Sequence, residues 1–523
     1  MRIPQKEDLE RFANKVPDYI VSDDNLPSQP LEYPGEGLDQ TFLNEDLTSM
    51  DACEVIHRKQ TLRVDRAHLL PGLTGFHSSY DTVVRYNVKL IAERVEYRVE
   101  TLEHIFSGKR VRADMSAIGP DRLKVTWDSI ALIVCLAIQM ALPIDRLRKL
   151  FASVSALSEA SICRYLELSA QKLLPIYLHF VQQFVESIDV IAGDDTVTRV
   201  LGMQKGAGAK DKNRDTLLTH IEEKLGRAFP RKDGLGAKSQ INVSHIHGRT
   251  DGHEPRSTIF FFRTHLGSVG DLLSKILTLK KPHHRPIVFQ GDLSRTNLPE
   301  KSLIERWITY LAGCAAHARR DFYRFREDDD RLCDRMLELF AIVHAVERYL
   351  QQAGRKPELI LYERRRLALP VWRQIIALAY SVLDAESKRQ AKNSRHFLWP
   401  KGSKLYKACH YIVRHQEELT RYIFDHRLSV TNNAAERQLR GEKILLVACK
   451  FRKSEKGRVV FDILRTIVMT AAAACDNPKA YLTWVLQQPD DDIKKCPQDF
   501  TPLAYYQKVQ RDRAYSDLQP TGT

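Results

Sequence analysis

A short apolar strand that ends in a carboxylate is the feature that most constrains the fold of this chain. Apolar side chains alternate along one face of residues 188–194, and Asp194 occupies the last position on that face. This two-residue period is typical of a β-strand. A lone carboxylate is costly to bury unless it is paired or bound to a metal. The segment therefore predicts a sheet that presents Asp194 as a metal ligand. Asp195 faces the other side of the strand and is a less favoured candidate for that role.

A second carboxylate stands near the start of a predicted helix. The stretch T-N-N-A-A-E-R, Thr431 to Arg437, begins with residues that favour turns and helix N-caps, so Glu436 falls in the first turns of that helix. Arg437, Arg440 and Lys443 follow at three-residue steps and line one side of it. From this stretch alone, a solvated ion-pair partner is the more common explanation of such a glutamate.

Two aspartates between these segments, Asp251 and Asp292, are candidates for a third carboxylate of the site. Asp251 lies in H-G-R-T-D-G-H-E-P, whose glycines and proline indicate the exposed tip of a hairpin. Asp292 directly follows the buried strand pattern I-V-F, which would carry it to the active edge of the sheet. We therefore predict that Asp292 belongs with Asp194 and Glu436.

The net charge makes a polyanion the first partner to consider. The 523 residues include 80 Lys and Arg against 66 Asp and Glu, a formal charge of +14, and the isoelectric point is near 9.2. Such an excess favours nucleic acid, although a basic enzyme without that partner is the alternative. Residues 202–240 form a glycine-dotted segment with nine Lys or Arg and five Asp or Glu, which would either hold DNA phosphates or remain a solvated loop.

Cysteine usage and hydropathy argue against several classes of protein. Nine cysteines are scattered without a C-x-x-C pair, which argues against a zinc ribbon or a disulfide framework and fits a reducing cytosol. Cys314 and His317 form a C-x-x-H, but no partner pair lies nearby, so no zinc site is expected there. The N-terminus does not resemble a signal peptide, and the longest apolar run, 130–142, is too short to span a bilayer.

Four stretches together resemble the insertion sequence sixty-six family of transposases, over about residues 120–490. T-N-N-A-A-E-R resembles the helix that supplies the last carboxylate of the family's Asp-Asp-Glu triad. I-A-G-D-D-T-V-T-R-V-L, from Ile191, resembles its first-Asp motif, which usually reads D-E-T. G-C-A-A-H-A-R-R-D-F, from Gly313, resembles its Cys-x-x-His-x-Arg-Arg segment. M-A-L-P-I-D-R-L-R-K-L-F with L-S-E-A-S-I-C-R-Y-L resembles the helical region before the first Asp.

The resemblance implies an α/β fold: an RNase H-like catalytic core with a large all-helical insertion, preceded by a small β module and a helical region. It implies a DNA transposase that cleaves the ends of an insertion sequence and joins the 3′ ends to target DNA. Asp194, Asp292 and Glu436 would be both the catalytic residues and the ligands of two Mg²⁺, for which Mn²⁺ could substitute. The family places its second Asp shortly before the Cys-x-x-His segment, and Asp292 precedes Cys314 by 22 residues whereas Asp251 precedes it by 63.

The same resemblance implies the partners. They are DNA, as terminal inverted repeats and target, and a second copy or more of the chain on DNA, with accessory proteins of the same element and no membrane. The expected location is the bacterial cytoplasm, at the nucleoid. The candidate phosphate contacts are His317, Arg319, Arg320, Arg437, Arg440 and Lys443. The residues alone predict only metal-dependent phosphoryl transfer on nucleic acid, so a nuclease of the same fold that does not join strands and a catalytically silent DNA-binding accessory protein remain as alternatives.

Many relatives carry a cysteine-rich zinc module near the N-terminus, but only Cys53 precedes Cys135 in this chain, so we predict no structural zinc there. Pattern changes predict an extended arm (1–78), a small β module (79–125), a helical region with helix-turn-helix spacing (126–187), the first part of the core (188–312), a helical insertion (313–425), the final catalytic and packing helices (426–475) and a tail (476–523).

Finer predictions concern single elements. Residues 146–154 and 159–166, with Ser158 as the cap of the second helix, have the spacing of a helix-turn-helix, although a plain helical hairpin explains them equally well. Val95, Tyr97 and Val99 alternate with charges and predict a strand. Strands are expected at 241–247, 257–263 and 286–290, and a helix at 303–311. Arg364 to Arg366 would be a phosphate-contact patch or simply a solvated helix face.

Overall fold

The computed structural model describes residues 93–103, 110–120, 123, 125–152, 157–200, 241–250, 254–352, 356–391, 403–449 and 454–518, which belong to one compact unit. The predicted N-terminal arm and the basic segment 202–240 lie outside these residues.

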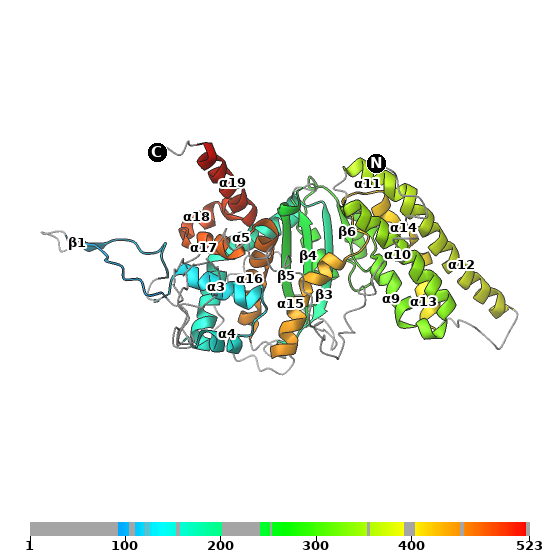
Figure 1. Cartoon of the computed structure of the whole chain (residues 1–523), viewed down its shortest axis with the longest axis horizontal. Coiled ribbons are helices and arrows are strands. Elements are labelled where there is room, and N and C mark those ends of the chain that lie inside the picture. The colour runs from blue at the N-terminus through cyan, green and yellow to red at the C-terminus, as the bar shows by residue number, and fades with distance from the viewer. Residues whose placement is uncertain are drawn as a thin grey trace, which may run out of the picture. The chain divides into compact units, whose positions relative to one another are not determined.

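A five-stranded mixed sheet forms the centre of the described fold (Figure 1). Its spatial order is β5 (Thr258–Leu266), β4 (Ile241–Arg249), β3 (Val190–Val197), β6 (Ile287–Gln290) and β7 (Ile308–Ala312). β4 is antiparallel to both β5 and β3, whereas β6 and β7 run parallel to β3. The predicted α/β class is confirmed, and the strand that carries Asp194 is the central one.

The strands predicted around 241–247, 257–263 and 286–290 are present as β4, β5 and β6. The helix predicted at 303–311 is wrong in its second half, because α8 (Lys301–Trp307) ends where β7 begins at Ile308. The run I-T-Y-L is rich in β-branched and aromatic residues, which favour a strand once a sheet edge is available to pair with. The missed strand is the one that precedes Cys314 and His317.

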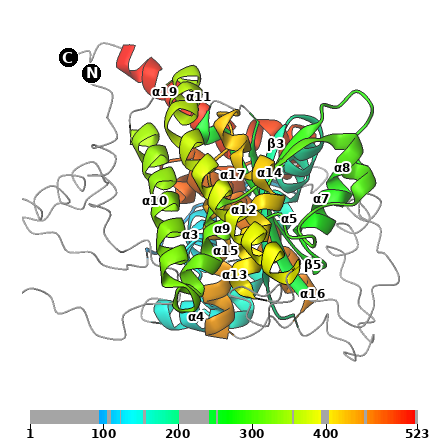
Figure 2. The same cartoon turned by 90° about the vertical axis from the view of Figure 1, so that its right-hand side faces the viewer.

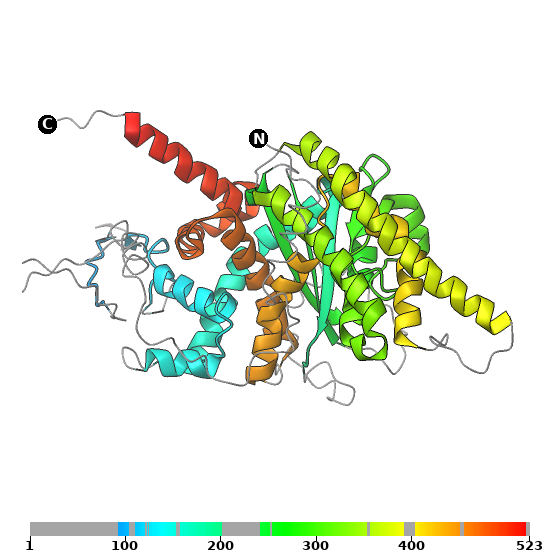
Figure 3. The same ribbon diagram turned by 45° about the vertical axis from the view of Figure 1, so that its right-hand side comes forward.

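Alternate residues of the strands pack into two different cores. Figure 3 shows that helices lie on both sides of the sheet. Ile191 and Phe289 face the first core, while Val288 and, in part, Val190 face the second. The helices of the first core are α3 (Trp127–Ile138), α4 (Ile144–Phe151), α5 (Glu159–Glu186), α7 (Val269–Thr278), α16 (Glu455–Ala474), α17 (Pro478–Gln487) and α18 (Asp490–Lys495), and α19 (Pro502–Leu518) packs beside them.

The second core is built from the helical insertion, which lies in front of the sheet in Figure 2. Its helices are α9 (Ala315–Arg324), α10 (Asp330–Gln352), α11 (Pro357–Glu363), α12 (Leu369–Ala391), α13 (Lys404–Arg414) and α14 (Gln416–Thr420). In the described part of the chain, one helical stretch, Pro357–Lys388, has the length and hydropathy to cross a membrane. Trp372 and Ile375 of that stretch are fully buried in the second core.

A π-helical turn, Arg364–Ala368, joins α11 to α12 just before Pro370. A π-turn shifts the register of a helix and re-aims its side chains. Arg364 is thereby buried: its Nε and Nη2 donate to Glu347 at 2.8 and 2.7 Å, and Nη1 donates to the carbonyl of Tyr422 at 2.6 Å. Arg364 is therefore a structural ion-pair partner, and the predicted phosphate-contact patch is wrong at this residue.

The N-terminal elements only partly follow the prediction. Ser158 caps α5 as expected, because its hydroxyl accepts from Ser161 N–H at 3.1 Å. The helix does not stop near residue 166 but runs on to Glu186 with a buried face along its length. In the β module, β1 (Thr101–Glu103) and β2 (Arg110–Arg112) pair, but residues 93–100 form no regular structure. The predicted strand around Val95 is therefore wrong, because the two short strands offer no face on which to bury it.

Helix α16 covers the outer edge of β5 with hydrogen-bonding side chains. Backbone N–H groups of alternate residues donate to this helix: Phe260 to Thr470 Oγ1 (3.0 Å), Phe262 to Thr466 Oγ1 (3.0 Å) and Thr264 to Asp462 Oδ2 (2.8 Å). The acceptors are four residues apart on one face of the helix, and the donors are two apart on the strand. The unpaired edge of the sheet is thus satisfied without another strand.

Replacing Thr466 by Val is expected to destabilise the protein by about 1–3 kcal/mol, because the near-isosteric side chain leaves the buried Phe262 N–H without an acceptor. Urea unfolding would measure this loss. Thr466→Ser keeps the hydroxyl and is the matched control. Equal stability of the Val and Ser variants would contradict the role given to this hydrogen bond.

Candidate active site

The strand register brings Asp194 and Asp292 to the same end of the sheet. β3 and β6 are parallel neighbours in which Val190 pairs with Val288 and Ala192 with Gln290. Both pairs have an offset of 98 positions, and the same offset relates Asp194 to Asp292, two residues beyond the last pair. Asp194 lies within β3 and Asp292 lies just after β6, and both are two residues beyond the point where the pairing of these two strands ends.

The loop after β6 holds Asp292 in a defined position. Its Oδ1 accepts from Ser294 N–H and from Asn297 Nδ2, both at 2.9 Å. Its carbonyl oxygen accepts from the Tyr411 hydroxyl of α13 at 2.7 Å. Leu293 has a φ of 60°, a left-handed conformation that is uncommon for a residue with a branched side chain and persists only when its surroundings fix it. Asp292 is thus tied to the sheet and to the insertion.

Asn432 connects the Glu436 helix, α15 (Asn433–Cys449), to β3. Its Nδ2 donates to the carbonyl of Gly193 at 2.8 Å, and its backbone N–H donates to Cys314 Sγ at 3.1 Å. A Cβ on Gly193 would lie 2.9 Å from a methyl group of Val269, so this position next to Asp194 has no room for a side chain. The Asn432 side chain thereby places the first turns of α15, and with them Glu436, beside the central strand.

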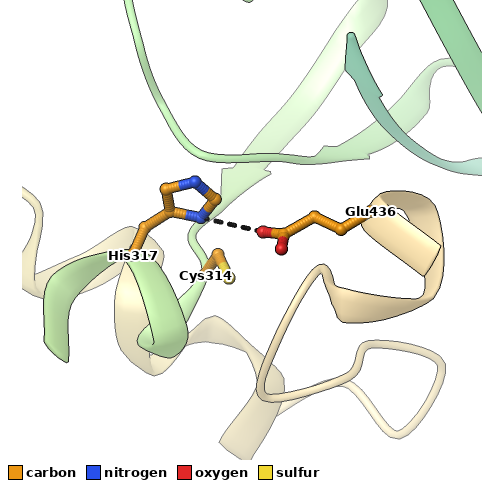
Figure 4. A group of neighbouring side chains, drawn as sticks. All are labelled: Cys314, His317 and Glu436. Atoms are coloured by element: carbon orange, nitrogen blue, oxygen red, sulfur yellow. Dashed lines mark ion pairs between the residues drawn. The ribbon is translucent and has the colours of Figure 1, made fainter. Parts of the chain in front are cut away.

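Cys314, His317 and Glu436 form a compact group (Figure 4). Cys314 directly precedes α9, and His317 lies in the first turn of that helix. His317 Nδ1 is 3.5 Å from Glu436 Oε1, and one ligand atom from each of the three residues lies within 4.8 Å of the others. Burial raises the pKa of the Cys314 thiol to about 11. The group joins the start of the insertion to the Glu436 helix.

Electrostatic coupling links the three carboxylates. Burial raises the pKa of Asp194 to about 7, and the charges of Glu436 and Asp292 act in the same direction. Burial also lowers the pKa of His317, with Arg320 adding to this effect and Glu436 and Asp292 opposing it. A bound cation would stabilise the charged form of Asp194, which faces these two other carboxylates.

The donor set fits a hard divalent cation. Glu436 Oε1 is buried and accepts no hydrogen bond from the residues that the structure describes, an unsatisfied state that is rare for a buried oxygen in a folded protein. Carboxylate oxygens from Asp194, Asp292 and Glu436 are the ligands that Mg²⁺ prefers. Two features of these residues therefore suit Mg²⁺: their carboxylate oxygens are the kind of ligand that it prefers, and Glu436 Oε1 lacks a hydrogen-bond partner among the described residues.

The predicted phosphate-contact residues fall into three groups. Arg437, Arg440 and Lys443 all lie on the exposed side of α15, as their spacing predicts. Arg320 is exposed and is close enough to His317 to lower its pKa. Arg319 instead faces other residues of the insertion. Its guanidinium lies 5.7 Å from the ring centroid of Tyr323. Its charge adds to the effect of burial, which lowers the pKa of His344 on α10. The structure thus separates Arg319 from the other candidates.

Several site residues were not predicted from the sequence. Asn432 was considered only as a turn or cap residue, and Tyr411 and Asn297 carried no signal. Asp195 lies on the other face of β3, as predicted, where Oδ2 accepts from Val269 N–H at the start of α7 at 3.0 Å. Asp251 lies outside the residues that the structure describes.

A comparison with protein-family models identifies a transposase domain within this chain. Residues 301–459 match the model described as "Transposase IS66 family", which confirms the family resemblance of the sequence. The matched residues include Cys314, His317 and Glu436, whereas Asp194 and Asp292 precede them. No curated protein matches the chain.

Proposed function

We propose that the protein is a DNA transposase of an insertion sequence, which cleaves the ends of its element and joins the 3′ ends to target DNA. The observation that supports this proposal is the electrostatic interaction of Asp194 with both Asp292 and Glu436, together with the strand register that relates Asp194 to Asp292 and the Asn432 bond that ties α15 to β3. The family match supports a transposase role. The strand order, with three antiparallel strands followed by two parallel ones, supports an RNase H-like core.

Asp194, Asp292 and Glu436 would hold two Mg²⁺, which when bound activate the attacking oxygen and stabilise the leaving oxygen of an in-line displacement. The protein itself contributes to the reaction by holding these carboxylates in fixed positions. Ser294 and Asn297 fix the Asp292 carboxylate, Asn432 fixes the start of α15, and His317 stands 3.5 Å from Glu436. Held carboxylates do not need to reorganise when the reaction begins.

DNA would approach across the exposed cations next to the carboxylates. Arg437, Arg440 and Lys443 stand on the α15 face that also carries the exposed Asn433, and Arg320 lies near His317. These residues would contact phosphates, which position DNA without reading its sequence. The expected partners are the terminal inverted repeats and target DNA, bound by a homodimer or larger assembly with accessory proteins of the element, at the nucleoid of a bacterial cytoplasm.

Affinity for DNA is expected to fall steeply with salt, because each neutralised phosphate releases counterions and contributes a slope of about −0.9 to log K against log salt. Replacing Arg437, Arg440 and Lys443 together by Gln should flatten the slope by about 2–3. Fluorescence anisotropy with end DNA at several salt concentrations would measure it. The control is a triple Gln variant at Lys301, Lys388 and Lys508, which are exposed and paired with acids on their own helices. Equal slopes for the two triple variants would remove α15 from the DNA interface.

The proposed function is tested with DNA from the flanks of the gene, since inverted repeats there would supply the substrate. Purified protein, labelled end DNA, a target plasmid and Mg²⁺ are incubated, and cleaved and joined products are separated on a gel. Joined products that the wild-type protein forms and the Glu436→Gln variant does not would support the transposase function. Cleavage without joining would identify a nuclease of the same fold. Binding of ends with neither reaction, and without binding of a divalent metal, would identify an accessory protein.

A further inference from the structure

The Cys314, His317 and Glu436 group has a chemistry that the three-carboxylate site does not use. It offers a sulfur, an imidazole nitrogen and a carboxylate oxygen within 4.8 Å of one another (Figure 4). Cys314 is fully buried, and its thiol is one of the two soft or borderline ligands in the group. Mg²⁺ has little affinity for sulfur, so Cys314 has no role in the site proposed above.

Unsatisfied atoms point to a missing partner for this group. His317 Nδ1 and Glu436 Oε1 are both inaccessible to water and have no hydrogen-bond partner among the described residues, although they lie 3.5 Å apart. Asn432 Oδ1 is buried and unsatisfied in the same way. Buried polar atoms without partners are rare in folded proteins, and a metal ion between His317 and Glu436 would give both atoms a partner. Two unsatisfied ligand atoms directed at one small region are therefore evidence for a ligand rather than for loose packing.

The surroundings of the thiol also fit a metal ligand. Asn432 N–H donates to Cys314 Sγ at 3.1 Å. Hydrogen bonds to a side chain that binds a metal orient that side chain and are characteristic of metal sites. The bond comes from Asn432, which directly precedes the Glu436 helix, so the same backbone segment positions two of the three ligand groups.

We propose that Cys314, His317 and Glu436 bind a thiophilic divalent ion such as Zn²⁺. Three protein ligands of these types leave the fourth tetrahedral position open for water. The thiol proton leaves to solvent as the sulfur–metal bond forms, because only the thiolate is a ligand. The C-x-x-H spacing did not predict this site, since the third ligand comes from α15, far along the chain.

The site shares Glu436 with the Mg²⁺ pair, and this consequence rests on the proposed function. A Zn²⁺ ion held by Cys314 and His317 would occupy the carboxylate that the Mg²⁺ pair requires. Zinc would then inhibit DNA cleavage even with Mg²⁺ in excess. The site is thus an inhibitory one, which keeps the enzyme inactive while the thiophilic ion is bound.

Binding is tested with Co²⁺, whose bonds to thiolate give a charge-transfer absorption band. The protein carries Cys→Ser changes at the exposed Cys163, Cys449 and Cys496, so that these surface thiols do not contribute, and at Cys53, which lies outside the described residues. The expected result is one Co²⁺ per chain with a thiolate band. Cys314→Ser should abolish the band, while the matched control Cys333→Ser, which removes another fully buried thiol, should keep it.

His317→Gln and Glu436→Gln should each weaken Co²⁺ binding by more than about tenfold while retaining the thiolate band at high metal concentration. These two variants test the site even if Cys314→Ser does not fold, which circular dichroism would reveal. A band of unchanged strength and affinity in all three variants, or no Co²⁺ binding by the parent protein, would overturn the proposal. Absence of Mg²⁺-dependent cleavage with an intact cobalt site would refute the proposed function and leave the site standing.

Discussion

Asp194→Asn and Glu436→Gln are each expected to abolish cleavage and strand joining while leaving the affinity for element ends nearly unchanged. Both changes remove a charged oxygen ligand and preserve the shape of the side chain. Loss of an outer-shell partner of a metal already costs about 10- to 100-fold, so loss of a direct ligand should exceed about 100-fold. Binding should persist, since phosphate contacts come from cations rather than from the carboxylates. A gel assay on end DNA and an anisotropy titration would measure the two effects separately.

Asp195→Asn is the matched control for this experiment. Asp195 is the next residue of the same strand, and its carboxylate accepts from Val269 N–H, which an Asn oxygen can also do. This variant should keep at least about a tenth of the activity, because its cost should not exceed the lower limit of the range of about 10- to 100-fold given above. Wild-type strand joining by Asp194→Asn or Glu436→Gln would end the assignment of these residues as metal ligands.

Asp292→Asn is expected to be as inactive as Asp194→Asn, whereas Asp251→Asn is expected to be active. The strand register relates Asp292, and not Asp251, to Asp194 just beyond the paired region of β3 and β6. An Asn at position 292 can still accept from Ser294 and Asn297, so the loop should keep its conformation and the thermal midpoint should change little. Cleavage of end DNA by both variants, with their melting curves, provides the measurement. An inactive Asp251 variant beside an active Asp292 variant would reverse the choice.

The features predicted correctly from the sequence depend on local patterns. The two-residue period around Asp194 identified the central strand, and the strand pattern before Asp292 identified β6. The three-residue steps of Arg437, Arg440 and Lys443 correctly predicted one exposed helix side. In each case the side chains that define the pattern are neighbours along the chain, so their spacing alone fixes the geometry.

The features that were missed depend on contacts between distant segments. β7 is a strand only because β6 supplies a pairing edge, and its sequence also suits a helix. The roles of Asn432 and Tyr411 come from bonds to Gly193 and Asp292, more than 100 positions away. Arg319 and His317 are two residues apart, which places them on opposite sides of a helix. The spacing could therefore have separated Arg319 from the other phosphate-contact candidates, whereas the family resemblance grouped them together.

The side-chain ladder from α16 to β5 also limits how copies of the chain can assemble. A strand edge with free N–H groups is a template on which another chain can extend the sheet, a mode known as β-augmentation. Here Thr470, Thr466 and Asp462 occupy those donors from within the same chain. Any pairing of copies on DNA must therefore leave this edge untouched, so the two ends of an element would be brought together without a sheet that continues through β5 from one copy to the next.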